Sequence, residues 1–225
     1  NTNQHKIQLT LSMRYGLLPI LFTFFAGLIN PLFAQQLIFK NYTVNDGLVA
    51  NSIRRIFQDS KGFLWIATWE GLSKYDGHKF TNYSTANGLS HNMVNDLFEL
   101  ANGRLYIATN GGGFDIIQEN RIIEKAAPAT ITVNHFVHFP DGKIIATTDN
   151  RGLQEFNNGK LTRLPKNMLL PTYLDLAVLN DSLFIAVGER GIQLLNRNYE
   201  IVSEVRNKEA IYTLFKIYKD SKKRI

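Results

Sequence analysis

Three acidic residues have side chains of the type that acid–base catalysis uses, namely Glu70, Asp149 and Glu189. Each follows a short apolar run within two positions, so the three are expected in corresponding loops of a repeated structure. A glycoside hydrolase needs two convergent carboxyl groups at a set separation. A secreted lyase or glycoside hydrolase therefore stays open as an alternative, although acidic residues are common on protein surfaces and do not by themselves predict an enzyme.

Other residues that could do chemistry do not form a motif. His135 and His138 are three residues apart in a predicted strand, so their side chains are expected on opposite faces. The run Gly111-Gly112-Gly113 is not followed by Lys and Ser or Thr, as a phosphate-binding loop would be. There is no cysteine, which excludes disulfides and thiolate metal sites. The sequence predicts no catalytic residue, no metal site and no cofactor.

The net charge of +6 is concentrated at the two ends of the sequence. Residues 1–34 contribute +2 and the last seven residues contribute +3, which leaves +1 for residues 35–218. A nearly neutral body lacks the basic stripe that binds nucleic acid, so no nucleic-acid partner is expected.

Residues 1–34 differ from the rest in composition. Met13–Ala34 has one charge at Arg14, an apolar run from Leu17 to Ile29 and a small residue before Gln35, which is typical of a signal peptide. A permanent membrane anchor is the alternative, but this run is shorter than the ~20 residues of a spanning helix. Residues 1–12 are interpreted as an upstream extension that is not native. The chain is therefore expected to be exported.

Each of the three acidic residues follows a copy of a short sequence pattern that recurs along the chain. Its four copies are FLWIAT at 63–68, RLYIAT at 104–109, KIIATT at 143–148 and SLFIAV at 182–187. A polar turn precedes each copy, and a glycine with an apolar residue follows it. The small residues Ala67, Ala108, Thr147 and Ala186 are spaced by 41, 39 and 39 residues. A fifth copy begins at 214–225, which overlays 53–64 at an offset of 161.

The segments between the copies repeat as well. Five residue identities recur at an offset of 41, namely Phe39, Tyr42, Gly47, Leu48 and Asn51 with Phe80, Tyr83, Gly88, Leu89 and Asn92. The two asparagines are expected to bond backbone groups of a turn through their side chains.

A period of about 40 residues, filled by short runs rich in β-branched and aromatic residues, is typical of one four-stranded propeller blade. The fold class is therefore predicted as all-β: a β-propeller of four-stranded antiparallel blades, of which about four to five from an expected seven are present. The blades are placed at about 51–90, 91–130, 131–170 and 171–210, with a partial one at 211–225. Strands of the first blade are expected at about 53–58, 63–68, 72–76 and 79–84, and Asp76-Gly77 predicts a hairpin turn between the last two.

Trp65 occupies the second predicted strand of the first blade, with Tyr106, Ile145 and Phe184 as its counterparts. We expect these side chains to pack between neighbouring blades. A sugar-stacking role for Trp65 is the alternative.

The residues from Asp59 to Leu72, the turn Tyr75-Asp76-Gly77, and Phe80, Tyr83, Gly88 and Leu89 form a pattern that resembles the two-component regulator propeller repeat. The resemblance covers roughly residues 37–225, although the third and fourth copies are degenerate and lack the tryptophan. It implies the periplasmic sensor region of a hybrid two-component histidine kinase of the Bacteroidetes type. Such proteins continue through further blades, a membrane span and a cytoplasmic output module, and commonly respond to polysaccharide fragments.

From this resemblance we expect residues 35–225 to be the N-terminal part of a ligand-sensing propeller that is not itself an enzyme. An oligosaccharide ligand and a homodimer of the full-length sensor are the expected partners. Contact with a membrane is expected only through the signal peptide and a span further along the protein. A protein-interaction propeller is a further alternative.

Loops between the second and third strands of a blade lie at the same end as the linker to the next blade, and binding sites are often built on loops held by a rigid scaffold. The predicted ligand-facing residues at this end are Trp69, Glu70, His91, Asn92, Asn110, Asp149, Asn150, Arg151, Glu189 and Arg190.

Overall fold

The computed structural model describes residues 39–125, 130–164, 172–189, 191–206 and 217. The chain divides into two compact units, Asn1–Asn41 and Tyr42–Ile225, and every element described below belongs to the second. The predicted signal peptide and nearly all of the predicted partial blade at 211–225 lie outside the described residues. Within the described ranges, no helix is long and apolar enough to cross a membrane.

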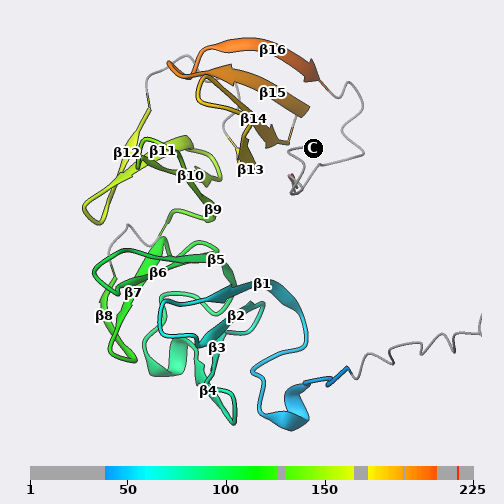
Figure 1. The fold of residues 1–225 in the computed structure, drawn as a ribbon, viewed down its shortest axis with the longest axis vertical. Helices are drawn as coiled ribbons and strands as arrows, with labels where there is room; N and C mark the ends of the chain where they lie inside the picture. The colour runs from blue at the N-terminus through cyan, green and yellow to red at the C-terminus, as the bar shows by residue number, and fades with distance from the viewer. Residues whose placement is uncertain (1–38, 126–129, 165–171, 190, 207–216, 218–225) are drawn as a thin grey trace, which may run out of the picture. The chain divides into compact units, whose positions relative to one another are not determined.

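The described residues of the second unit form four antiparallel sheets of four strands each, and strands that follow one another in the sequence pair side by side (Figure 1). The predicted all-β propeller architecture is confirmed. The first sheet contains β1 (Ile53–Gln58), β2 (Leu64–Thr68), β3 (Leu72–Tyr75) and β4 (Phe80–Tyr83). The second contains β5 (Val94–Glu99), β6 (Leu105–Thr109), β7 (Phe114–Gln118) and β8 (Arg121–Lys125).

The third and fourth sheets repeat this arrangement. The third contains β9 (Val133–His138), β10 (Ile144–Thr148), β11 (Gly152–Asn157) and β12 (Lys160–Arg163). The fourth contains β13 (Tyr173–Val178), β14 (Leu183–Gly188), β15 (Gly191–Asn196) and β16 (Ile201–Arg206). The innermost strands β1, β5, β9 and β13 lie next to one another in sequence order. The four sheets are therefore successive blades.

The strands predicted for the first blade agree with the observed ones to within one residue at each end. The predicted Asp76-Gly77 hairpin turn joins β3 to β4. The Asp76 carboxylate accepts hydrogen bonds from the backbone N–H groups of His78 and Lys79, at 2.9 and 2.8 Å. The N–H groups of Lys79 and then His78 lower the pKa of Asp76 against an opposing effect of desolvation, and the nearby positive charges add to the lowering.

Three hydrophobic clusters fill the three interfaces between neighbouring blades. In the first interface Trp65, 1% exposed, packs against Leu97 and Ile117 of the next blade. Tyr106 packs in the same way against the third blade, within a group of rings that includes Phe136. The packing role predicted for Trp65 is therefore confirmed.

The pairing of the first and second strands in each blade shows that one predicted equivalence, that of Phe184 with Trp65, is wrong. Arg55, Asp96 and His135 pair with Ala67, Ala108 and Thr147, whereas Asp175 pairs with Val187 and not with Ala186. The last step of the repeat is thus 40 residues, and Ile185 rather than Phe184 is the counterpart of Trp65. An apolar run aligns equally well in either register, but a shift of one residue moves a side chain to the other face of a strand. Phe184 accordingly packs back onto the third blade.

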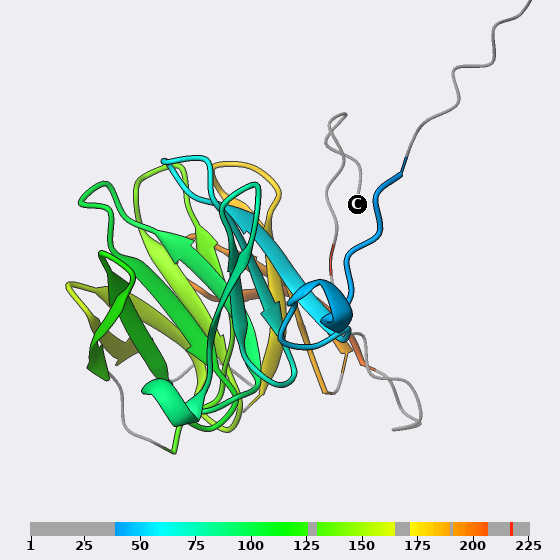
Figure 2. The same cartoon turned by 90° about the horizontal axis from the view of Figure 1, so that it is seen from below.

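The repeated linkers form two short 3₁₀ helices, η1 (Val44–Asp46) and η2 (Thr85–Asn87), which lie outside the sheets (Figure 2). The Asn51 side chain accepts a hydrogen bond from the Val44 N–H at 3.0 Å. Asn92 accepts one from the Thr85 N–H at 2.7 Å, so both asparagines form turns as predicted. The linkers also share a left-handed glycine and a buried leucine, namely Gly47 and Gly88, Leu48 and Leu89.

Candidate functional site

The predicted ligand-facing residues lie in the loops between the second and third strands of each blade and in the linkers. Trp69 and Glu70 occupy this loop of the first blade. The Trp69 side chain is 54% exposed, and the Arg54 guanidinium lies 5.7 Å from the centre of its ring. Glu70 is also exposed. An exposed aromatic ring beside a carboxylate is a pair of groups that can stack on a sugar ring and accept hydrogen bonds from its hydroxyl groups.

In the second blade the structure brings the predicted loop and linker residues together. The Asn110 N–H donates to the Met93 carbonyl at 3.0 Å, and the Met93 N–H donates to His91 Nδ1 at 3.0 Å. Asn92 follows His91, and its side-chain oxygen is the one that accepts from Thr85. His91 and Asn92 therefore each use one acceptor to hold the linker.

In the third blade, the predicted residues contact β9 and the linker to the fourth blade. Asp149 accepts a hydrogen bond from the Asn134 amide at 2.7 Å. The Asn150 N–H donates to the Thr172 hydroxyl at 3.2 Å, and Asn150 itself has a φ of 62°. Arg151 is exposed. This loop presents a carboxylate, an amide and a guanidinium on backbone that is held by hydrogen bonds.

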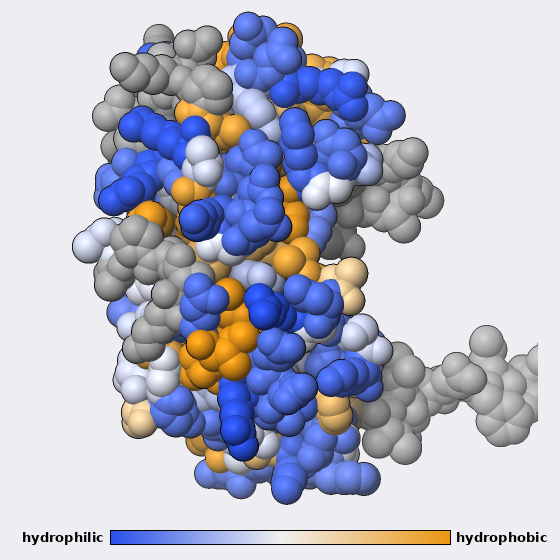
Figure 3. All heavy atoms as spheres, turned by 90° about the vertical axis from the view of Figure 1, so that its left-hand side faces the viewer, coloured by the Kyte–Doolittle hydropathy of each residue, from blue (hydrophilic) through white to orange (hydrophobic). Residues whose placement is uncertain are grey.

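Glu189 is exposed in the corresponding loop of the fourth blade, and Arg190 lies outside the described residues. In the part of the chain that is described, no hydrogen bond or ion pair joins Glu70, Asp149 and Glu189 to one another. On the face drawn in Figure 3, hydrophilic side chains cover most of the surface, with smaller apolar patches between them. That these ten residues face a ligand stays a prediction.

Sequence reasoning missed a row of charged residues along the innermost strands. Arg55, Asp96, His135 and Asp175 occupy the same position of β1, β5, β9 and β13, beside an irregularity in the pairing with the second strand. Arg55 Nε lies 3.2 Å from an Asp96 carboxylate oxygen, and His135 Nδ1 lies 2.6 Å from the other. His135 Nε2 lies 3.5 Å from Asp175. We call these four residues the inner belt.

Backbone groups complete the inner belt. The Phe136 N–H donates to Asp96 at 2.8 Å, and the Ile217 N–H donates to Asp175 at 2.8 Å. Burial raises the pKa of Asp96, but the charges of His135 and Arg55 and the Phe136 N–H outweigh burial and hold this pKa below its usual value. The Asp96 and Asp175 side chains are each 2% exposed, so the belt joins each blade to the next from within.

A signal for the inner belt is present in the sequence. Each innermost strand has a charged residue or histidine at its third position, as in IRRIFQ, VNDLFE, VNHFVH and YLDLAV. A charge at the same place in each copy indicates that the blades contact one another there. The periodic pattern alone does not show which residues pair, because the partners are about 40 residues apart.

The two histidines of β9 have separate environments. His135 belongs to the inner belt, whereas the ring of His138 lies 5.0 Å from that of Phe98 at 75°. Burial lowers the pKa of His138, with Asp96 acting in the opposite direction and His135 in the same one. Among the residues that the structure describes, no group of three or more His, Asp or Glu side chains could hold a metal ion.

Comparison with known proteins identifies the repeat. The family model for the two component regulator propeller matches residues 47–70 and 88–111. Over these two stretches the chain is similar to the two-component regulator propeller repeat. They cover the linker, first strand and second strand of the first two blades, which are the blades that the sequence pattern matched most closely.

The chain is also similar in sequence or structure to proteins named as parts of two-component systems. A stretch of 46 residues is 46% identical to Histidine kinase P4 of Formosa agariphila and covers 20% of this chain and 3% of that protein. The extracellular domain described as that of the hybrid two component system BT3049 from B. thetaiotaomicron superposes with a TM-score of 0.70 at 22% identity, over 81% of this chain and 28% of that one. The corresponding domain of BT4673 gives 0.54 at 20% identity, over 74% and 25%. The chain thus spans about a quarter of these domains, and the similarity to them establishes the propeller fold.

Proposed function

We propose that this chain is the ligand-sensing part of an exported two-component signalling protein. It detects carbohydrate fragments in the periplasm and passes the signal across the inner membrane to a histidine kinase or another output module. The observation that carries the proposal is the pair of two-component regulator propeller repeats at 47–70 and 88–111, set within four successive blades. The names of the relatives, a histidine kinase and two extracellular domains of hybrid two component systems, support it.

The geometry fits sensing better than catalysis. The acidic residues that could have served a hydrolase are exposed or hydrogen-bonded to a neighbouring amide, and each lies in a different blade. The buried ionisable groups of the inner belt are already paired within the protein. We therefore propose a propeller that is not itself an enzyme, acts within a homodimeric sensor, and binds ligand through side chains displayed on rigid blades.

The direct test is genetic. In the bacterium that makes this protein, the gene is deleted and transcript levels are measured after a shift from glucose to each of several polysaccharides. We expect one polysaccharide to induce a set of transcripts in the wild type but not in the deletion strain, with recovery when the gene is restored. Equal induction in the deletion strain for every polysaccharide would contradict the proposed function.

Export has an independent test. The protein recovered from its own cells should begin at Gln35 when its N-terminus is analysed by mass spectrometry. Retention of Met13–Ala34 in the recovered protein would contradict the signal-peptide interpretation.

A further inference from the structure

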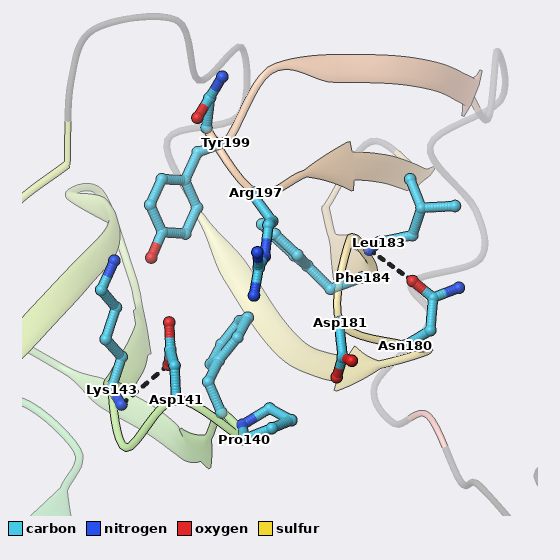
Figure 4. Close-up of a pocket in the computed structure, with 11 residues that line it drawn as sticks. Pro140, Asp141, Lys143, Asn180, Asp181, Leu183, Phe184, Arg197 and Tyr199 are labelled. Atoms are coloured by element: carbon cyan, nitrogen blue, oxygen red, sulfur yellow. Dashed lines mark hydrogen bonds between the residues drawn. The ribbon is translucent and has the colours of Figure 1, made fainter.

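A cavity of about 280 Å³ lies between the third and fourth blades. It is enclosed by residues of the turns between β9 and β10, between β13 and β14, and between β15 and β16 (Figure 4). Because strands alternate in direction, these turns lie at the opposite end of the blades from the ligand-facing loops predicted above. The cavity is therefore distinct from that loop surface.

The equivalent place between the first and second blades is largely filled. The cavity there measures about 100 Å³. The Lys74 ammonium lies 3.5 Å from the centre of the Phe63 ring and donates a hydrogen bond to the Asn120 side chain at 2.6 Å. Trp65, which pairs with Lys74 across β2 and β3, also lines this smaller cavity.

In the third blade the corresponding pair is Ile145 and Glu155. Isoleucine is smaller than tryptophan, and glutamate is shorter than lysine and carries the opposite charge. Glu155 is not among the residues that line the larger cavity. The open space between the third and fourth blades thus follows from two changes at equivalent positions of the repeat.

The three turns around the cavity are each held by one polar side chain. Asp141 accepts from the Lys143 N–H at 3.1 Å, and Asn180 accepts from the Leu183 N–H at 3.0 Å. Asn196 accepts from the N–H groups of Asn198 and Glu200 at 2.9 and 3.0 Å. A site whose walls are fixed beforehand loses less entropy when a ligand binds.

Aromatic rings form one wall of the cavity. The ring centres of Phe139 and Phe184 are 5.3 Å apart, and those of Phe184 and Tyr199 are 5.4 Å apart. Tyr199 has a φ of 62°, a left-handed conformation that non-glycine residues adopt rarely and that is often found at ligand sites. Desolvation, and then the charges of Glu155 and Asp141, raise the pKa of Tyr199 to about 12.

Charged side chains reach the same space from both blades. Figure 4 shows Asp141 and Lys143 of the third blade turned toward Arg197 and Tyr199 of the fourth. Within the described part of the chain, the side chains of Lys143 and Arg197 make no hydrogen bond or ion pair. The cavity therefore combines an aromatic wall with free donors and with carboxylate acceptors.

We propose that this cavity binds one sugar ring of the carbohydrate ligand, an inference that rests on the proposed function and places the ligand at the turn end of the blades. Its volume is near the lower end for small-molecule sites, which suits a single ring. The apolar face of the sugar packs on Phe184 and Tyr199. Its hydroxyl or carboxylate oxygens accept hydrogen bonds from Lys143 and Arg197, and its hydroxyl groups donate to Asp141 and Asp181.

The test measures sugar binding by the full 225-residue chain with saturation-transfer NMR, using cellobiose as a neutral probe and digalacturonate as an acidic one. Arg197→Ala removes a charged donor. Tyr199→Asn removes the ring but keeps a residue type that tolerates positive φ. Trp69→Ala and Arg151→Ala test the loop end as the rival site, and Arg163→Ala, at an exposed position of β12 outside both sites, is the matched control. Circular dichroism confirms that each variant is folded.

We expect at least one probe to bind the wild type, and both cavity variants to bind it about tenfold more weakly, which is the size of a lost charged hydrogen bond. Arg163→Ala should bind as the wild type does. Loss of binding in Trp69→Ala or Arg151→Ala but not in the cavity variants would overturn this site while leaving the sensor function standing. Failure of both probes to bind the wild type would also overturn it, and the transcript experiment would then decide the proposed function separately.

Discussion

The interface between the first and second blades and the interface between the third and fourth blades are built on the same backbone plan but packed differently. In the first, the Trp65 indole donates to the Asp59 carboxylate at 2.8 Å. That carboxylate also accepts from the N–H groups of Lys61 and Phe63, so the ring is fixed to its own turn. In the last, Ile145 occupies the position equivalent to Trp65, and a cavity of about 280 Å³ lies at the equivalent place.

The difference shows what the repeat pattern encodes. The family model matches the linker and first two strands of the two blades that form the filled interface. The Asp, Trp and Gly residues of the pattern there are occupied by turn formation and packing. A cavity suited to a ligand lies where two successive blades depart from the pattern. In this chain, the blades that depart from the repeat pattern therefore say more about where a ligand binds than the blades that match it.

The largest loss of stability is expected when the filled interface between the first and second blades is disrupted. Trp65→Ala removes a fully buried ring and should lower the free energy of unfolding by about 3–5 kcal/mol. Urea unfolding followed by circular dichroism measures this without relying on the altered fluorophore. Trp69→Ala is the matched control, because its exposed ring should contribute less than about 1 kcal/mol. Equal losses in the two variants would show that Trp65 does not hold the blades together.

The inner belt is common to all three described interfaces. Its disruption should cause the second-largest loss of stability. Asp96→Asn removes the charge that faces Arg55 and His135 and should cost about 1.5–3 kcal/mol at pH 7. Because the folded pKa of Asp96 is depressed, its contribution is complete above its unfolded pKa of about 4 and is lost as the pH falls through the folded pKa. Unfolding free energies should therefore fall less steeply below pH 4 in the variant than in the wild type. Parallel pH profiles would contradict this account of the belt.

Removal of the ammonium group of Lys74 should have a smaller effect. Lys74→Met keeps most of the aliphatic stem but loses the contact with the Phe63 ring and the hydrogen bond to Asn120. The expected cost is about 1–2 kcal/mol. Lys79→Met, at an exposed position of the following turn, is the control and should change stability little. If Lys74→Met were as stable as the control, the ammonium would not be what fills the first interface.

The smallest effect concerns tyrosine ionisation. Burial alone raises the pKa of Tyr83 in the first interface, whereas Glu155 and Asp141 act in addition to burial on Tyr199, whose pKa is about 12. The stabilisation linked to the protonated Tyr199 phenol is present below pH 10 and lost as the pH rises toward 12. Titration at 295 nm should show a late-ionising tyrosine that Tyr199→Phe lacks and that Asp141→Asn shifts to lower pH. An unshifted titration in Asp141→Asn would contradict the proximity of these charges.

Much of the fold could be predicted from the sequence because its signals are local. The Asp76-Gly77 hairpin and the strands of the first blade each depend on neighbouring residues, and the structure bears them out. The equivalence of Phe184 with Trp65 was wrong because an apolar run does not fix its own register. The inner belt and the cavity were missed since both arise from side chains in different blades. Neither feature can be deduced from the pattern of one copy.

Binding of a sugar between the third and fourth blades should slow hydrogen–deuterium exchange there in the full chain. Exchange is compared with and without the tighter-binding of the two disaccharides. The account predicts slower exchange in residues 139–143 and 196–200, with no change in residues 69–71 and 110–113. Slower exchange confined to 69–71, 110–113 and 149–151 would contradict it and place the ligand on the loops at the other end of the blades.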